Sequence, residues 1–271
     1  MEYTLENELL TLTVESHGAE LWDLRRKAAP EEPLLWDGKP SVWSRRAPVL
    51  FPWCGRVEDN WYEDQGIRYE RLPQHGFNRD MEHTMVEQGE DAILFRLNWP
   101  GDGEKFPWKF SFETRHTLKG NVVETVCTGI NTGNRPMPAQ LGFHAGLRCP
   151  FTPGKSYSDY IIRFEKPEAP DGSDVFELDP HTFDNDSTCF PDLKSAWIQV
   201  EERGTGKALR LDTEGFPFVL LWSPKGCEEF VCIEPWTGFV GPGHDLSKRP
   251  GAVVLQPGES LTAAHRLTVE L

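Results

Sequence analysis

Four short segments place a titratable or cationic side chain beside glycine or proline in an apolar setting: 45–56, 72–79, 140–147 and 232–238. A histidine and a carboxylate can act as acid and base near neutral pH, because their ordinary pKa values lie close to that range. Glu234 follows the apolar run 231–233, and partial burial there would raise its pKa toward a useful value. The residues therefore predict proton transfer, with His75, His144 and Glu234 as candidates.

The same segments carry groups that could hold a sugar. Trp53 and Trp236 offer flat apolar faces of the kind that stack on sugar rings, and Arg56 offers a fork of donors for ring hydroxyls. Each residue also has a purely structural interpretation. A histidine beside glycine is common in turns, Arg56 could tie a loop, and Glu234 could simply end a strand. By contrast, His116 and His265 share apolar strand faces and are expected to pack in the core.

The elements that must position these candidate side chains are predicted to be β-strands. Apolar residues alternate with polar ones in short runs rich in β-branched and aromatic residues, which is typical of half-buried strands. The main runs are 10–14, 93–99, 106–118, 122–130, 161–164, 197–200, 209–211, 218–222, 230–233 and 261–271. No helical stripe separates them and no linker interrupts them. The sequence predicts an all-β fold, a large antiparallel β-sandwich or twisted barrel, as a single domain over 1–271.

The charge and composition of the chain limit the classes of partner and ligand that it is expected to bind. The 271 residues carry 28 Lys and Arg against 43 Asp and Glu, a net charge of −15, which would repel nucleic acid and anionic membranes. No apolar run reaches the length of a membrane span and no secretion signal is visible, so a cytoplasmic location with reduced thiols is expected. No two histidines lie within four residues of each other, and nucleotide-binding motifs are absent. We therefore expect no metal and no cofactor.

Taken in order, the unusual segments resemble the aldose 1-epimerase (galactose mutarotase) family. They are most similar to its shorter branch of mutarotase-like proteins and hexose-6-phosphate epimerases. The resemblance spans nearly the whole chain and rests on an ordered set of motifs: Gly18-Ala19-Glu20-Leu21, Pro48-Val49-Leu50-Phe51-Pro52, Gly55-Arg56, His75-Gly76-Phe77, Gly142-Phe143-His144, Cys232-Ile233-Glu234-Pro235-Trp236 and Leu255-Gln256-Pro257-Gly258-Glu259.

The resemblance implies a galactose mutarotase-like supersandwich with a sugar cleft on one concave sheet. It implies that His144 is the general acid at the ring oxygen and Glu234 the general base at the anomeric hydroxyl, with Arg56 and His75 binding the sugar. A further active-site aspartate is expected between His144 and Glu234. Asp184, Asp186 and Asp212 lie in that interval, and Asp186 is the choice.

These expectations lead to a hypothesis with rivals. The first is an aldose 1-epimerase that interconverts the anomers of a free hexose, as a monomer or homodimer without nucleic-acid or membrane partners. A glucose-6-phosphate (hexose-6-phosphate) 1-epimerase is the alternative, because Arg45, Arg46, Arg56 and Arg79 could hold a phosphate. A non-catalytic carbohydrate-binding protein is the rival of another class. A glycoside hydrolase would need a second facing carboxylate.

Overall fold

The computed structural model describes residues 1–271 and consists of β-strands with four short 3-10 helices. The largest sheet has nine strands, in the order β16-β15-β18-β19-β23-β11-β10-β9-β8. Its strands are β8 (Thr84–Gln88), β9 (Ala92–Trp99), β10 (Phe110–Lys119), β11 (Val122–Asn131), β15 (Tyr160–Phe164), β16 (Val175–Glu177), β18 (Trp197–Glu202), β19 (Ala208–Asp212) and β23 (Ser260–Glu270).

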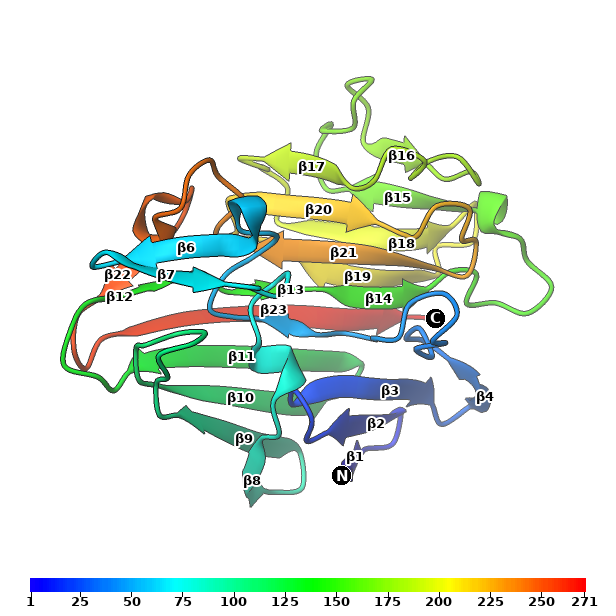
Figure 1. Ribbon diagram of the computed structural model, residues 1–271. Coiled ribbons are helices and arrows are strands. Elements are labelled where there is room, and N and C mark those ends of the chain that lie inside the picture. Colours follow the sequence, from blue (N-terminus) through cyan, green and yellow to red (C-terminus); the bar gives the residue numbers. More distant parts are fainter.

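A six-stranded sheet carries the residues of interest, and in Figure 1 its strands β20 and β21 lie in front of β18 and β19. It comprises β5 (Val49–Leu50), β13 (Gly142–Phe143), β14 (Ala145–Arg148), β17 (Thr188–Pro191), β20 (Phe218–Trp222) and β21 (Phe230–Trp236). A four-stranded sheet contains β1 (Glu2–Glu6), β2 (Leu10–Glu15), β3 (Glu20–Arg26) and β4 (Ala29–Pro33).

The remaining elements are short. Two hairpin-like pairs are β6 (Trp61–Asp64) with β7 (Ile67–Glu70), and β12 (Met137–Ala139) with β22 (Val253–Leu255). The 3-10 helices are η1 (Glu58–Asn60), η2 (Asn78–Asp80), η3 (Tyr157–Asp159) and η4 (Leu246–Lys248). None of the helices is long and apolar enough to cross a membrane. Every strand pairing within the sheets is antiparallel, as the sequence predicts.

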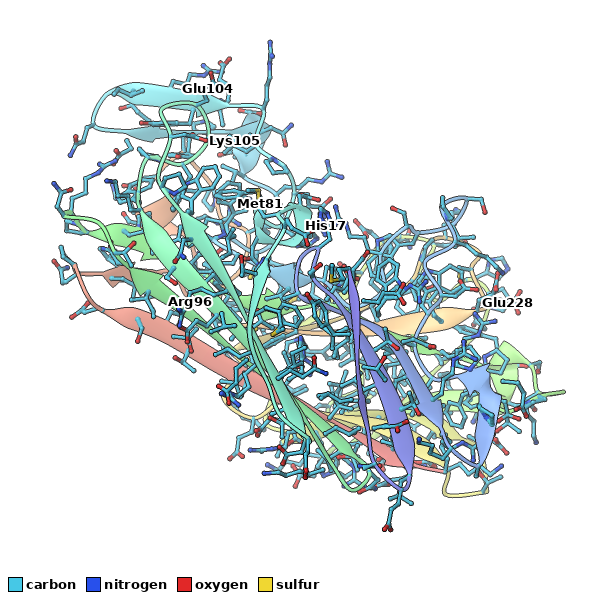
Figure 2. All side chains as sticks on the ribbon, turned by 90° about the horizontal axis from the view of Figure 1, so that it is seen from below. His17, Met81, Arg96, Glu104, Lys105 and Glu228 are labelled. Atoms are coloured by element: carbon cyan, nitrogen blue, oxygen red, sulfur yellow. The ribbon has the colours of Figure 1, made fainter.

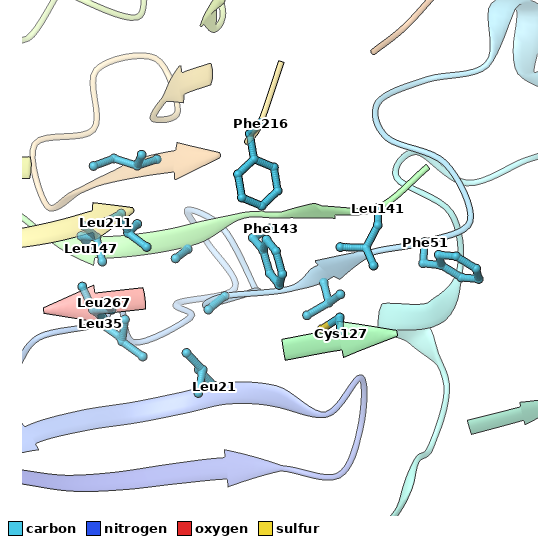
Figure 3. Packing of buried hydrophobic residues seen from close by; sticks show 14 of the residues in the cluster. Leu21, Leu35, Phe51, Cys127, Leu141, Phe143, Leu147, Leu211, Phe216 and Leu267 are labelled. Carbon is cyan, nitrogen blue, oxygen red and sulfur yellow. The ribbon is translucent and has the colours of Figure 1, made fainter. Parts of the chain in front are cut away.

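The two smaller sheets pack on the nine-stranded sheet through one core cluster of 58 buried apolar residues. Phe143 of β13 lies against His265 of β23, and Tyr3 of β1 lies edge-on to Phe95 of β9. Figure 3 shows Leu147 of β14 and Leu211 of β19 among the side chains of this cluster. The charged side chains labelled in Figure 2, such as Glu104, Lys105 and Glu228, lie at the margins of the molecule, while side chains fill the space between the ribbons.

The alternation seen in the sequence matches the burial in the structure. Every second residue of β11 is buried, and in β10 His116 is fully buried, with Nδ1 on the Thr125 hydroxyl and Nε2 on the Ala19 carbonyl. The expected packing role of His116 and His265 is thus confirmed. The run 106–118 is shorter than expected, because β10 begins only at Phe110. Pro107 has no N–H for a ladder, which accounts for the late start.

Candidate active site

The candidate site is a cavity of about 1010 Å³ on the six-stranded sheet. Its floor is one face of the paired strands, and its walls are loops from two separate stretches of the sequence, 43–79 and 186–242. The floor residues are His144, Leu220, Trp222, Glu234 and Trp236, and the wall residues are 43–45, 55–60, 74–75, 79, 186–187 and 239–242. Pockets of about 300–1,000 Å³ take small-molecule ligands, so the cavity has room for a monosaccharide and a substituent.

The strand register brings His144 and Glu234 together. Gly142 pairs with Trp236 and Ala145 with Ile233, so His144 lies directly opposite Glu234 across the β13–β14 and β21 ladder. Directly opposite residues project from the same face of a sheet. The His144 Nε2 atom is 3.2 Å from the Glu234 Oε2 atom, and both side chains are buried at the floor of the cavity. The sequence-predicted acid and base are therefore neighbours.

Two glycines on the same face leave room for this pair. A Cβ on Gly142 would lie 2.7 Å from the Trp236 ring, and a Cβ on Gly146 would lie 3.2 Å from the ring of Trp43. Because residues i and i+2 of a strand share a face, the two glycines flank His144 on the cavity side. The Gly-Phe-His-Ala-Gly segment thus admits one tryptophan on each side of the imidazole.

Burial sets the electrostatics of the pair. Burial, with a smaller contribution from the Arg79 and Arg45 guanidinium groups, lowers the pKa of His144 to about 3. Burial also raises the pKa of Glu234 well above its ordinary value, with the Asp186 carboxylate adding to the increase. Both effects disfavour net charge. At a separation of 3.2 Å the two groups are expected to hold one proton between them.

His75 is held in a defined tautomer at the edge of the cavity. Its Nδ1 atom accepts a hydrogen bond from the Gly55 N–H at 3.0 Å, and the backbone N–H of His75 donates to the Gly55 carbonyl. The neutral ring therefore carries its proton on Nε2, which is available as a donor. His75 has a left-handed backbone, and Gly76 approaches Phe51 so closely that a Cβ on it would lie 2.0 Å from the Phe51 oxygen.

Buried polar side chains fix the walls. Glu20 accepts hydrogen bonds from the N–H groups of Arg46 and Ala47, at 2.6 and 2.7 Å, next to the cavity residue Arg45. Gln140 accepts from the Cys54 N–H and donates to the carbonyl groups of Phe239 and Pro250. Glu20 thereby anchors one wall and Gln140 joins two others.

Most other predicted site residues also reach the cavity. Arg56, His75, Asp186 and Trp236 all line it. Asp186 has a positive φ of 79° in a loop, an uncommon conformation for a non-glycine residue. Its carboxylate is near enough to Glu234 to raise the pKa of that group. Whether these residues contact a sugar stays a prediction.

Trp53 is the exception, and its predicted role at a sugar face is wrong for this structure. Its side chain is 1% exposed and packs against Tyr62, Phe77 and Phe106 outside the cavity. Its indole N–H donates to the Pro73 carbonyl at 3.1 Å. A tryptophan gains more from burial than from exposure once its N–H has a partner.

Sequence reasoning missed three aromatic residues of the cavity, Trp43, Trp222 and Phe239. Trp222 ends β20 on the same face as Leu220, so the alternation of that strand could have indicated it. Trp43 lies in the loop before β5, where no periodic pattern exists to orient it. Arg45 and Arg79, named only as candidate phosphate ligands, line the cavity, whereas Arg46 does not.

The profile of the aldose 1-epimerase family matches residues 1–268. The chain belongs to the aldose 1-epimerase family. It is 26% identical to the chromosomal protein LacX of Lactococcus lactis subsp. lactis, over 99% of each chain.

Solved structures of this family share the fold of the present member. A galactose mutarotase related enzyme from Lactobacillus acidophilus is 26% identical, with a TM-score of 0.91 over 100% of this chain and 98% of that one. A galactose mutarotase-like protein from Lactobacillus casei is 23% identical, with a TM-score of 0.89 over 99% and 100% of the two chains. The expected mutarotase-like all-β fold is thereby confirmed.

Proposed function

We propose that this family member is an aldose 1-epimerase that interconverts the α and β anomers of a hexose. The observation that carries the proposal is the buried His144–Glu234 pair at the floor of the cavity. The ring oxygen and the anomeric hydroxyl of a pyranose are both bonded to C1. An acid and a base that serve them must therefore lie side by side, as this pair does.

The pair can open and reclose the sugar ring with no net gain or loss of protons. Glu234 takes the proton of the C1 hydroxyl, His144 gives its proton to the ring oxygen, and the bond from C1 to the ring oxygen breaks. Rotation about the C1–C2 bond then presents the other face of the aldehyde. On reclosure His144 takes the proton back from the attacking hydroxyl and Glu234 returns its proton to the carbonyl oxygen. The pair holds one proton throughout, with no covalent intermediate.

The remaining cavity residues have supporting roles in this proposal. The His75 Nε2–H and the Arg56 guanidinium donate hydrogen bonds to sugar hydroxyls, and Asp186 accepts them. Trp236 presents its ring as an apolar wall beside His75, at 5.3 Å between ring centroids. The test is anomer exchange measured by NMR for a panel of freshly dissolved aldoses. Sugar binding without faster exchange would instead indicate the non-catalytic carbohydrate-binding protein.

A wide pH plateau is expected for this reaction. Independent groups with ordinary pKa values would give the active forms only between 4.5 and 6.5. If the buried pair gains a second proton, it carries a net positive charge, and if it loses the shared proton, it carries a net negative charge. Burial disfavours both of these charged states. The acid limb should therefore lie below pH 4.5 and the alkaline limb above 6.5. Exchange rates across that range, corrected for buffer catalysis, check this, and a narrow maximum inside it would contradict it.

A specific observation favours a phosphorylated hexose as a second candidate substrate. Three arginine side chains line the cavity of a strongly acidic protein. Arg45 forms an ion pair with Asp80, whereas the Arg56 guanidinium has no hydrogen-bond or ion-pair partner. Arg79 makes one hydrogen bond, to the Gln74 carbonyl, and its buried Nε has none. Unpaired guanidinium groups are well suited to bind a phosphate.

Replacement of Arg56 distinguishes the two substrates. A charge-assisted hydrogen bond contributes about 1.5–3 kcal/mol, or about 10- to 100-fold in affinity. If Arg56 binds a phosphate instead of a sugar hydroxyl, Arg56→Gln should weaken hexose 6-phosphate at least tenfold as a substrate or competitor, while the free hexose changes less than threefold. Arg203→Gln, at an exposed arginine paired with Glu177, is the control. Equal small effects on both sugars would contradict the phosphorylated substrate.

A further inference from the structure

Trp43 lies flat against the imidazole of His144. The two ring centroids are 4.9 Å apart with an interplanar angle of 27°. Trp43 has two further aromatic neighbours: Phe230 lies parallel to it at 5.5 Å and Trp222 meets it edge-on at 5.5 Å. Trp43 is half-buried and lines the cavity. The stack therefore joins a loop residue directly to the proposed acid.

The loop that carries Trp43 is held in place. The N–H groups of Val42 and Trp43 both donate to the Lys39 carbonyl, and the Trp36 indole N–H donates to the Trp43 carbonyl at 2.7 Å. The Lys39 ammonium forms an ion pair with Glu229 at 2.6 Å. These contacts fix the backbone on both sides of the indole, so the ring has a defined position beside His144.

The charged and titratable groups around His144 differ in their effect on its imidazolium form, and several oppose that form. An aromatic face can add to its stabilisation. Glu234 of β21 favours the imidazolium form, whereas burial and the guanidinium groups of Arg45 and Arg79 oppose it. His75 lies edge-on at 5.4 Å, and the Cys232 thiol lies within 4.8 Å. Burial keeps that thiol protonated by raising its pKa, so it contributes no charge.

An indole face is negative and attracts a cation within about 6 Å of its centre. We propose that Trp43 is a positioning residue that stabilises the imidazolium form of His144, so that the shared proton shifts from Glu234 toward the histidine, against the effect of burial. This inference rests on the proposed function, in which His144 must start as the acid. It adds a residue that acts through His144 and needs no contact with the sugar.

The test uses the sugar-free protein, so it does not depend on catalysis. Ring ¹⁵N shifts of His144, assigned with a His144→Gln variant, give the ratio of imidazolium to neutral imidazole at pH 7. In Trp43→Leu this ratio should fall about tenfold, within the range expected for a buried cation–aromatic contact. Trp43→Phe keeps an aromatic face and should restore most of the ratio.

Trp61→Leu is the matched control, because Trp61 stacks on a different histidine, His244, at 3.3 Å between centroids. It should leave the His144 ratio unchanged. An unchanged ratio in a folded Trp43→Leu protein would overturn the proposal. If Trp43→Leu does not fold, Trp43→Phe decides, since it must still show a measurable drop, and no drop overturns the proposal. If no aldose shows faster anomer exchange, the proposed function fails while these shifts still decide the role of Trp43.

Discussion

Replacement of Glu234 by glutamine should slow anomer exchange by about 100- to 10,000-fold, the usual contribution of a positioned acid or base. Glutamine has the same shape and can still hydrogen-bond His144, but it cannot take the proton of the C1 hydroxyl. The buried position has no other carboxylate that could replace it, because Asp186 lies in an exposed loop. NMR exchange rates at saturating sugar, with wild type at equal concentration, measure the loss.

Asp59→Asn is the matched control for Glu234. Asp59 also lines the cavity, but its side chain is 73% exposed and its ion-pair partner is His244 at 3.8 Å. Its replacement should change the rate less than threefold. A folded Glu234→Gln protein that keeps more than a tenth of the wild-type rate would contradict the assignment of the base.

Replacement of His144 by glutamine should cause a loss of the same order, because the acid and the base act on the same proton cycle. The double variant His144→Gln, Glu234→Gln should then be no more than about threefold slower than the slower single variant. Residues that act as one unit are strongly non-additive, whereas independent contributions would multiply. Exchange rates of wild type, the two single variants and the double variant complete the double-mutant cycle. If the loss in the double variant equals the product of the two single losses, the two residues do not work as a pair.

The strands and the nature of the site could be predicted because their signals are local. Alternation over seven to eleven residues predicted β9, β11 and β23, and glycine and proline beside titratable residues indicated the segments around His144 and Glu234. That these two residues lie opposite each other could not be predicted, because they are 90 positions apart and meet only through the register of β14 on β21. Only the family resemblance linked them beforehand.

The aromatic residues show where local reasoning fails. Trp53 and Trp236 both follow a proline in unusual segments, yet Trp53 faces the core and Trp236 the cavity. The side to which each ring turns depends on the packing of distant segments, such as Phe77 and Phe106 around Trp53. Trp43 lies in a loop whose position is set by Trp36 and Glu229, so no pattern in its own segment indicates it.

The most direct test of the central claim is the decay of optical rotation of a freshly dissolved α-anomer with wild type and with the double variant. The proposed mechanism predicts that wild type accelerates the approach to anomeric equilibrium, in proportion to its concentration, for at least one hexose or hexose 6-phosphate. It also predicts that the double variant, folded and at equal concentration, gives about the uncatalysed rate. A double variant as fast as wild type, or a wild type that accelerates none of these sugars, would contradict it.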